Sequence, residues 1–236
     1  MIYDYILGCN CSSNIQQFDF LLDYIAHFFK KPEEKPQKAL FICGNQGSGK
    51  GLFVSILEDC LGPYACYLVG MKKFHSYINT FQSSTQFLVT IDECEKLNEV
   101  TLNMIKDVIT SSSREYGLKA KSTPVMNPLY FRFIIISIDE NVIKMCSTER
   151  RYFALNTCLR EKSCYSSLTK FIGDHHAEIC ETFIYEMFHR DIIRFSPYET
   201  LVTDFQSYIM KKRLVQTKEQ SLVSFFKIRN GSVLQG

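Results

Sequence analysis

The chain has 236 residues, of which 46% are hydrophobic and 22% are charged, so it can bury the core of one large domain or of one domain with a small appendage. A formal net charge of +2 excludes a protein that is basic over its whole surface, so any surface for nucleic acid must be local. The ten cysteines include no C-x-x-C pair, which argues against zinc and against a disulfide framework. We expect a soluble protein without a membrane span or a signal peptide, because no apolar run is long enough and residues 1–5 are not basic.

The first predicted elements are a helix and a strand. Apolar residues at helical spacing predict a helix over 14–31, and two prolines with mixed charges follow it over 32–36. The apolar run Ala39–Cys43 predicts a buried strand, and the sequence LFVSILEDCL over 52–61 predicts a helix. The chain therefore passes from a strand through a glycine-rich loop into a helix.

The loop between this strand and helix carries a phosphate-binding motif. A nucleotide-binding P-loop needs glycines that let backbone N–H groups surround a phosphate, a helix amino terminus with partial positive charge, and a lysine that reaches the β- and γ-phosphates. All three features occur here in that order. We therefore expect a nucleoside triphosphate to be bound by Gly44, Asn45, Gln46, Gly47, Ser48, Gly49, Lys50 and Gly51.

Gly51 departs from the motif. The residue after the lysine is usually Ser or Thr, whose hydroxyl coordinates Mg²⁺. A water can replace that hydroxyl, because Mg²⁺ usually keeps several waters. Gly51 therefore weakens the case for catalysis but not the case for phosphate binding.

The remaining elements alternate between strands and helices. Strands are predicted over 67–69, 87–91 and 131–138, and helices over 72–81 and 99–110. Helical patterns dominate the sequence that follows Ser167. This order predicts an α/β fold with a central, mostly parallel sheet and a helical C-terminal region.

The same order divides the chain into three parts. We expect a helical lead-in over 1–36, a P-loop ATPase core over 37–160 and a helical C-terminal region over 161–236.

Two carboxylates follow the strand predicted over 87–91. In a P-loop enzyme the first acid at this point holds Mg²⁺ through water, and the second polarises the water that attacks the γ-phosphate. An apolar run that ends in two acids is common, but this pair lies 42 residues after Lys50, with a helix between them. We therefore predict that Asp92 binds magnesium through water and that Glu93 is the catalytic carboxylate.

Beyond these two motifs the chain resembles the superfamily 3 helicases, in particular the helicase part of the primase-helicases found in phages, plasmids and DNA viruses. The resemblance runs from Leu21 to about Phe226 and includes the approach to the phosphate loop, the acidic strand end, the strand FRFIIIS and the C-terminal sequences HRDIIRFSP and SLVSFF. It implies an AAA+-like P-loop NTPase that binds ATP and Mg²⁺ and assembles as a homo-hexamer on single-stranded DNA. By the same resemblance Gly51 is a tolerated variant.

The resemblance also implies a DNA-binding hairpin after the helix predicted over 99–110. Lys119 corresponds best to the key lysine of the family and Lys121 is a second candidate, since Gly117 and Pro124 mark a turn around them and Asn127 follows. Lysines at a hairpin tip that lines a ring would contact phosphates without reading bases. Isolated lysines are more often ordinary solvated side chains.

In this family the third strand ends in Ser-Asn, and the Asn senses the γ-phosphate and places the water. Here Ile138 follows Ser137, and an isoleucine cannot do this. The remaining sensor candidates are Ser137, Asp139 and Asn141, although an acid near a triphosphate would repel it.

Arg150 and Arg151 match the Arg-Arg pair of the family. A planar, permanently charged guanidinium can stabilise transition-state charge on the nucleotide of a neighbouring subunit. We predict this role for one of the two, with a slight preference for Arg150, and we expect Arg151 to brace the fold. The alternative is an ordinary surface pair.

The sequence favours an ATP-dependent DNA helicase or translocase of viral or mobile-element replication, which would act together with a primase or polymerase domain. We expect it in the cytoplasm or, in a eukaryotic host, in the nucleus or at a viral replication site. A catalytically weak assembly factor that binds ATP and DNA is the alternative that Gly51 and Ile138 favour. A nucleotide or shikimate-type kinase is a third reading, and the placement of Arg150 and Arg151 argues against it.

Overall fold

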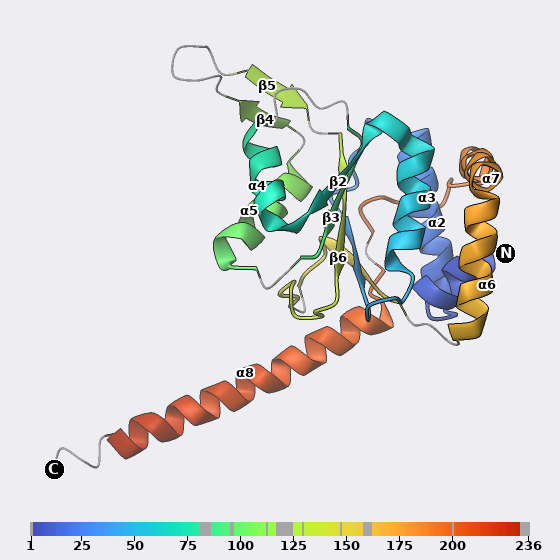
Figure 1. Ribbon diagram of the computed structural model, residues 1–236. Helices are drawn as coiled ribbons and strands as arrows, with labels where there is room; N and C mark the ends of the chain where they lie inside the picture. Colours follow the sequence, from blue (N-terminus) through green and yellow to red (C-terminus); the bar gives the residue numbers. More distant parts are fainter. Residues whose placement is uncertain are drawn as a thin grey trace.

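The computed structural model describes residues 2–80, 86–94, 97–111, 113–116, 125–128, 130–146, 148–157, 162–199 and 201–231. Within them, five parallel strands form one sheet in the order β2-β3-β6-β1-β7. The strands are β1 (Ala39–Cys43), β2 (Ala65–Val69), β3 (Leu88–Asp92), β6 (Arg132–Ser137) and β7 (Tyr152–Asn156). Helices cover both faces of the sheet (Figure 1), which confirms the predicted α/β class with a parallel sheet.

The two faces are covered by different helices. One face packs against α2 (Ile15–Lys30), α3 (Lys50–Leu61) and α7 (His176–His189), and α6 (Lys162–Asp174) adds Ile172 to the same core. The other face packs against α4 (Gly70–Thr80) and α5 (Glu99–Thr110). The sheet is therefore the middle layer of three (Figure 1).

The strands read as continuous apolar runs because both of their faces are buried. Successive side chains of a strand point to opposite faces. Phe41 and Ile135 lie in the core beneath α4 and α5, whereas Ile42 and Ile136 lie in the core beneath α2 and α3. A parallel sheet covered by helices on both sides requires this pattern.

Asparagine caps fix the starts of two of these helices. The side-chain oxygen of Asn14 accepts a hydrogen bond from the Gln17 backbone N–H at 3.1 Å, and Asn98 accepts one from Thr101 at 2.8 Å. Such caps satisfy N–H groups that have no partner within the helix. The predicted helices over 14–31 and 99–110 are thus confirmed to within a residue at each end.

Four elements were not predicted individually from the sequence. The chain begins with α1 (Ile2–Tyr5), which continues into a π-helix over Ile6–Asn10, and a short 3₁₀ helix spans Gly62–Tyr64. Strand β7 is the fourth. It pairs with β1 from Ala39 opposite Tyr152 to Cys43 opposite Asn156, and so forms one edge of the sheet.

A separate antiparallel pair stands away from the sheet (Figure 1). It consists of β4 (Ser113–Tyr116) and β5 (Val125–Pro128), and Arg114 pairs with Asn127. A hairpin was expected in this part of the chain. Lys119 and Lys121 lie outside the described residues, so their role in DNA binding stays a prediction.

The last helix, α8 (Asp204–Gly231), starts beside β7 and then runs away from the body of the protein (Figure 1). Its start is anchored by the buried residues Thr203 and Gln206. The Thr203 hydroxyl donates to the Ala154 carbonyl at 2.5 Å, and the Gln206 amide donates to the Glu149 carbonyl at 3.2 Å. Neither α8 nor any other helix in the described part of the chain combines the length and the apolar character needed to cross a membrane.

Candidate nucleotide-binding cleft

The glycine-rich loop connects the carboxyl end of β1 with the amino end of α3. Gly47 and Gly49 have φ angles of 75° and 91°, in the left-handed region that favours glycine. Gly49 is the N-cap of α3, and Lys50 and Gly51 are the first residues of the helix. The two glycines therefore allow the turn that brings the loop to the positively polarised end of α3.

Gly44 is required for a different reason, which is close packing against the residue after β7. A Cβ atom added to Gly44 would lie 2.1 Å from the Thr157 hydroxyl oxygen and 2.8 Å from that of Ser48. These two hydroxyl oxygens are 2.6 Å apart, and the Thr157 hydroxyl donates to the Cys43 carbonyl at 3.1 Å. Thr157 thus braces the loop from the edge strand. Sequence reasoning missed it because β7 was missed, although the apolar run Tyr152–Leu155 was a signal for a strand.

Lys50 lies over the loop and is 9% exposed. Its ammonium group donates to the Gly44 carbonyl at 2.5 Å and to the Asn45 carbonyl at 2.8 Å. Burial lowers the pKa of Lys50, and the negative charge of Asp92 opposes this effect. The lysine is therefore a poorly solvated positive charge at the centre of the loop, where it would favour a phosphate.

Asp92 and Glu93 lie at the carboxyl end of β3. One oxygen of Asp92 accepts a hydrogen bond from the Glu93 backbone N–H at 2.7 Å, and the other accepts one from the Tyr67 hydroxyl. Glu93 has a φ angle of 51°, which is uncommon for a residue other than glycine, and its side chain is exposed. Such backbone conformations occur preferentially at functional sites.

Tyr67, on β2, was not among the predicted site residues. Burial and then the hydrogen bond to Asp92 raise the pKa of Tyr67, so its hydroxyl stays protonated and remains a donor. No sequence signal connects the two residues. Their contact depends on the register of β2 and β3, in which Val69 lies opposite Asp92.

The sensor candidates take different positions. Ser137 is buried, and its hydroxyl donates to the Cys94 carbonyl at 2.9 Å and accepts from the Asp139 N–H at 3.0 Å. Asp139 in turn accepts from the Asn141 N–H at 2.9 Å. Ile138, at the position expected for the sensor, is 73% exposed. The hydroxyl of Ser137 is thus used to hold the turn after β6.

The phosphate loop, the acidic pair and the end of β6 line one cleft of about 720 Å³. This volume is in the range of small-molecule sites in proteins. Lys50, Asp92, Glu93, Ser137 and Asp139 are all among its lining residues. Asn141 is not, and lies instead in a neighbouring cavity of about 490 Å³ beside α8.

The donor set of this cleft fits Mg²⁺ bound to a nucleotide. Mg²⁺ prefers oxygen ligands, keeps several waters, and is usually held by one or two carboxylates together with substrate phosphates. Asp92 supplies such a carboxylate next to the phosphate loop. The described residues contain no group of three or more His, Cys, Asp or Glu side chains that could hold a metal by itself.

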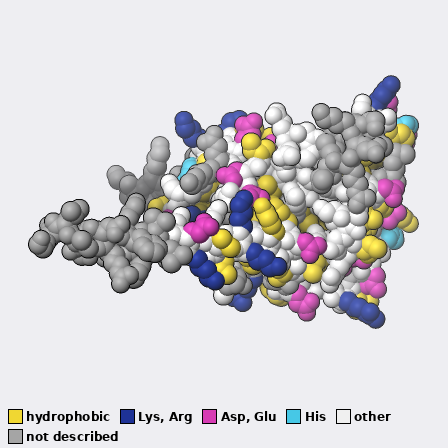
Figure 2. Space-filling model, turned by 90° about the horizontal axis from the view of Figure 1, so that it is seen from below, with side chains coloured by type: hydrophobic (Ala, Val, Ile, Leu, Met, Phe, Trp, Pro, Cys, Tyr) yellow, Lys and Arg dark blue, Asp and Glu magenta, His cyan; other side chains and the backbone are white. Residues whose placement is uncertain are grey.

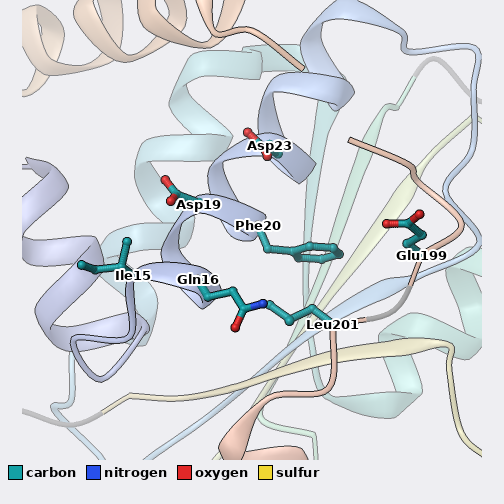
Figure 3. A pocket seen from close by; sticks show the side chains of 7 residues that line it. All are labelled: Ile15, Gln16, Asp19, Phe20, Asp23, Glu199 and Leu201. Carbon is teal, nitrogen blue, oxygen red and sulfur yellow. The ribbon is translucent and has the colours of Figure 1, made fainter. Parts of the chain in front are cut away.

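A second hollow, of about 610 Å³, lies between α2 and the segment that carries Glu199 and Leu201 (Figure 3). Its polar side chains include Asp19 and Asp23, both of which pair with Arg190, at 3.2 Å and 2.5 Å. Its described lining residues include the carboxylates of Asp19, Asp23 and Glu199, but no lysine or arginine and no glycine-rich loop that could bind a phosphate. This hollow is therefore not a candidate for the nucleotide site.

Arg150 and Arg151 lie at the opposite ends of the strands from the cleft. The Ala39 N–H donates to the Arg151 carbonyl at 2.8 Å, which places the arginines beside the amino end of β1, whereas the phosphate loop follows its carboxyl end. Arg151 pairs with the buried Glu149 at 3.3 Å, and Lys106 pairs with the same carboxylate at 3.3 Å. Arg150 is exposed. Neither arginine lines the cleft of its own chain.

The face of the molecule in Figure 2 carries acidic and basic side chains side by side. This mixture agrees with the net charge of +2. Any strongly basic surface for nucleic acid must therefore be local rather than spread over this face.

The comparisons with known proteins show the fold. No family model and no curated protein sequence matches the chain. Among solved structures, two apo structures of the C-terminal region of NrS-1 have a TM-score of 0.70 at 15% and 16% identity, and both cover 89% of this chain. A third structure of that region has a TM-score of 0.68 at 16% identity and the same coverage. This chain spans about half the length of those chains, 49–50% of each.

Proposed function

We propose that the chain is the ATP-hydrolysing motor part of a DNA helicase or translocase that serves the replication of a virus or mobile element. In this proposal it is an AAA+-like P-loop NTPase of the superfamily 3 type, and it works as a homo-hexamer on single-stranded DNA. A primase or polymerase activity would come from another domain or protein.

One observation carries this proposal. One cleft is lined by the phosphate loop after β1, by Ser137 at the end of β6 and by Asp92 and Glu93 at the end of β3, and these three strands are neighbours in the sheet. Ligands of open parallel sheets bind at the carboxyl ends of the strands. A lysine-bearing loop beside two carboxylates at that edge is the set of groups that nucleoside triphosphate hydrolysis uses.

In this proposal, different residues of the cleft bind the phosphates, orient the metal and activate the attacking water. The loop N–H groups and Lys50 bind the β- and γ-phosphates, and Asp92 orients the hydrated metal. Bound Mg²⁺ would supply neutralisation of the charge that develops on the phosphate oxygens. Glu93, which is exposed toward the cleft, accepts a proton from the attacking water.

The arginines complete the site across a subunit boundary. Arg150 is exposed at the amino edge of the sheet, away from the cleft of its own chain. In a ring, this edge of one subunit would face the cleft of the next, where a guanidinium can stabilise transition-state charge. Arg151 braces Glu149 within its own chain.

A specific observation favours a second candidate, an assembly factor that binds ATP and DNA but hydrolyses ATP poorly. Gly51 provides no hydroxyl for the metal, and the exposed Ile138 occupies the place of the sensor. These two features would slow hydrolysis without preventing phosphate binding.

Steady-state ATPase assays with and without single-stranded DNA separate the two candidates. A motor predicts Mg²⁺-dependent hydrolysis that DNA stimulates and that Lys50→Ala abolishes. ATP binding that also requires Lys50, together with hydrolysis no faster than that of the Lys50→Ala variant, would favour the assembly factor. Failure to bind ATP at all would refute both.

A further inference from the structure

Tyr67 contacts the acidic pair from outside the sequence motifs. It lies on β2, the edge strand next to β3. Its hydroxyl donates to one oxygen of Asp92, and the other oxygen of Asp92 accepts the Glu93 backbone N–H at 2.7 Å. The carboxylate is therefore fixed at both of its oxygens. Each carboxylate oxygen has a second lone-pair site, so these bonds leave Asp92 able to accept hydrogen bonds from metal-bound water.

The orientation of Asp92 matters more for placing Mg²⁺ in this chain than in a chain with the usual P-loop. A P-loop with Ser or Thr after the lysine holds Mg²⁺ from two sides, through that hydroxyl and through the acid at the strand end. Gly51 offers no side-chain oxygen, so more of the placement of the metal depends on Asp92. Partners that orient a metal-binding carboxylate typically affect metal affinity by about 10-fold to 100-fold.

Packing does not explain why a tyrosine occupies position 67. Its side chain is 46% exposed, and it is not part of either hydrophobic core of the sheet. An exposed aromatic ring on an edge strand contributes little to burial, whereas its hydroxyl is held on one carboxylate of the cleft. The contact with Asp92 is thus the main structural consequence of a tyrosine at this position.

We propose that Tyr67 is a positioning residue that holds Asp92 in the orientation in which it binds the hydrated Mg²⁺ of a bound nucleotide. This inference rests on the proposed function. It also implies that Tyr67 compensates for the hydroxyl that Gly51 does not provide, so the effect of Tyr67 on Mg²⁺ binding should be largest in a loop without that hydroxyl.

The first test is Tyr67→Phe, which keeps the ring and removes the hydroxyl. We expect the Mg²⁺ concentration for half-maximal binding of a fluorescent ATP analogue to rise about 10-fold. Thermal unfolding without nucleotide should change little. Tyr64→Phe is the matched control, since Tyr64 is similarly exposed, at 49%, and its ring lies against that of Phe87, at a tilt of 53°, rather than beside a carboxylate of the cleft. This control should keep the wild-type Mg²⁺ dependence.

The second test restores the hydroxyl that the loop lacks. A Cβ atom at Gly51 would have no atom within 4 Å, so Gly51→Ser fits without a clash. In this background Tyr67→Phe should raise the Mg²⁺ requirement by clearly less than in the wild type. Equal penalties in both backgrounds would contradict the compensating role.

The outcomes separate this inference from the proposed function. If the wild type binds the nucleotide in a Mg²⁺-dependent manner and Tyr67→Phe has the same or a lower Mg²⁺ requirement, Tyr67 does not position Asp92 and the proposed function stands. If nucleotide binding by the wild type does not respond to Mg²⁺, this inference is refuted, whereas the proposed function is decided separately by the Mg²⁺ dependence of hydrolysis.

Discussion

The ends of the parallel strands form two sides of the sheet: a carboxyl edge, which carries the cleft, and an amino edge, which carries Arg150 and Arg151. These two edges differ in how their charged groups are held. At the carboxyl edge, Lys50, Asp92 and Ser137 are fixed by hydrogen bonds to the backbone around one cleft. At the amino edge, Arg151 is fixed by the buried Glu149, but the neighbouring Arg150 is exposed. A five-residue strand separates the edges by about 16 Å at roughly 3.3 Å per residue. One edge therefore resembles a preorganised site, whereas the other exposes the charge of Arg150 to solvent.

This difference indicates how the site would be completed. A nucleotide bound at the carboxyl edge lies beyond the reach of the arginines of its own chain, because these start at the far end of β7. If Arg150 or Arg151 takes part in hydrolysis, it must act on the nucleotide of a second copy. Catalysis would then depend on assembly, while nucleotide binding would not.

Lys50→Ala tests the carboxyl edge and has the largest expected effect. Lys50 supplies the central positive charge of the phosphate loop, so we expect loss of ATP binding and of turnover. Binding of a fluorescent ATP analogue measures the affinity for the nucleotide, and circular dichroism checks that the variant is folded. The exposed Lys73 on α4 provides the control, since Lys73→Ala should bind ATP like the wild type. Unchanged hydrolysis in the Lys50→Ala variant would refute the P-loop assignment.

Arg150→Ala tests the amino edge. We expect ATP binding to persist, because the loop of the same chain is untouched, and the ATPase rate to fall by about 10³-fold. Mixing this variant with Lys50→Ala should restore part of the activity, because mixed rings contain interfaces with an intact loop facing an intact arginine. The wild-type rate per subunit should also rise with protein concentration.

Arg151→Ala is the matched control for Arg150. It removes one partner of the buried Glu149 and should lower the free energy of unfolding by roughly 1–3 kcal/mol. The effect of Arg151→Ala should therefore appear in urea unfolding.

The concentration dependence of the ATPase rate can contradict the role proposed for Arg150. A wild-type ATPase rate per subunit that stays constant down to concentrations at which the protein is a monomer would assign both arginines a purely structural role.

Glu93→Gln separates binding from chemistry at the carboxyl edge. The change neutralises the carboxylate that would activate water, so hydrolysis should fall by about 10²-fold or more while ATP binding is kept. Asp92→Asn should instead weaken the Mg²⁺ dependence of binding. A single-turnover assay together with nucleotide binding distinguishes the two variants. If both lose ATP binding, the roles assigned to the two acids are wrong.

The carboxyl edge could be read from the sequence because its groups belong to contiguous motifs. The phosphate loop and Asp92-Glu93 each follow an apolar strand directly, and parallel strands bring such ends together. Tyr67 and Thr157 could not be found in this way. Each acts on a motif that is distant in the chain, through the register of neighbouring strands, which a single sequence does not reveal.

The amino edge was harder to predict for a related reason. Charged residues directly precede β7 and conceal its start, so the sequence suggested an arginine pair but not the strand that follows it. Within the helical lead-in expected over 1–36, only the helix over 14–31 was predicted, and α1 was missed. Yet Tyr5 is 2% exposed, and its hydroxyl donates to the Gly49 carbonyl at 2.6 Å.

Tyr5→Phe has the smallest expected effect and asks whether the start of the chain supports the carboxyl edge. The Gly49 carbonyl also accepts from the Leu52 N–H at 3.1 Å, so removing the tyrosine hydroxyl does not leave it without a donor. We therefore expect a loss of about 1 kcal/mol in the free energy of unfolding and a measurable decrease in ATP affinity that does not exceed about 10-fold. Tyr198→Phe, at an exposed position, serves as the control in both measurements. A loss of stability without any change in ATP affinity would show that Tyr5 anchors α1 but does not support the phosphate loop, and the preorganisation of the carboxyl edge would then depend on Thr157 and the loop itself.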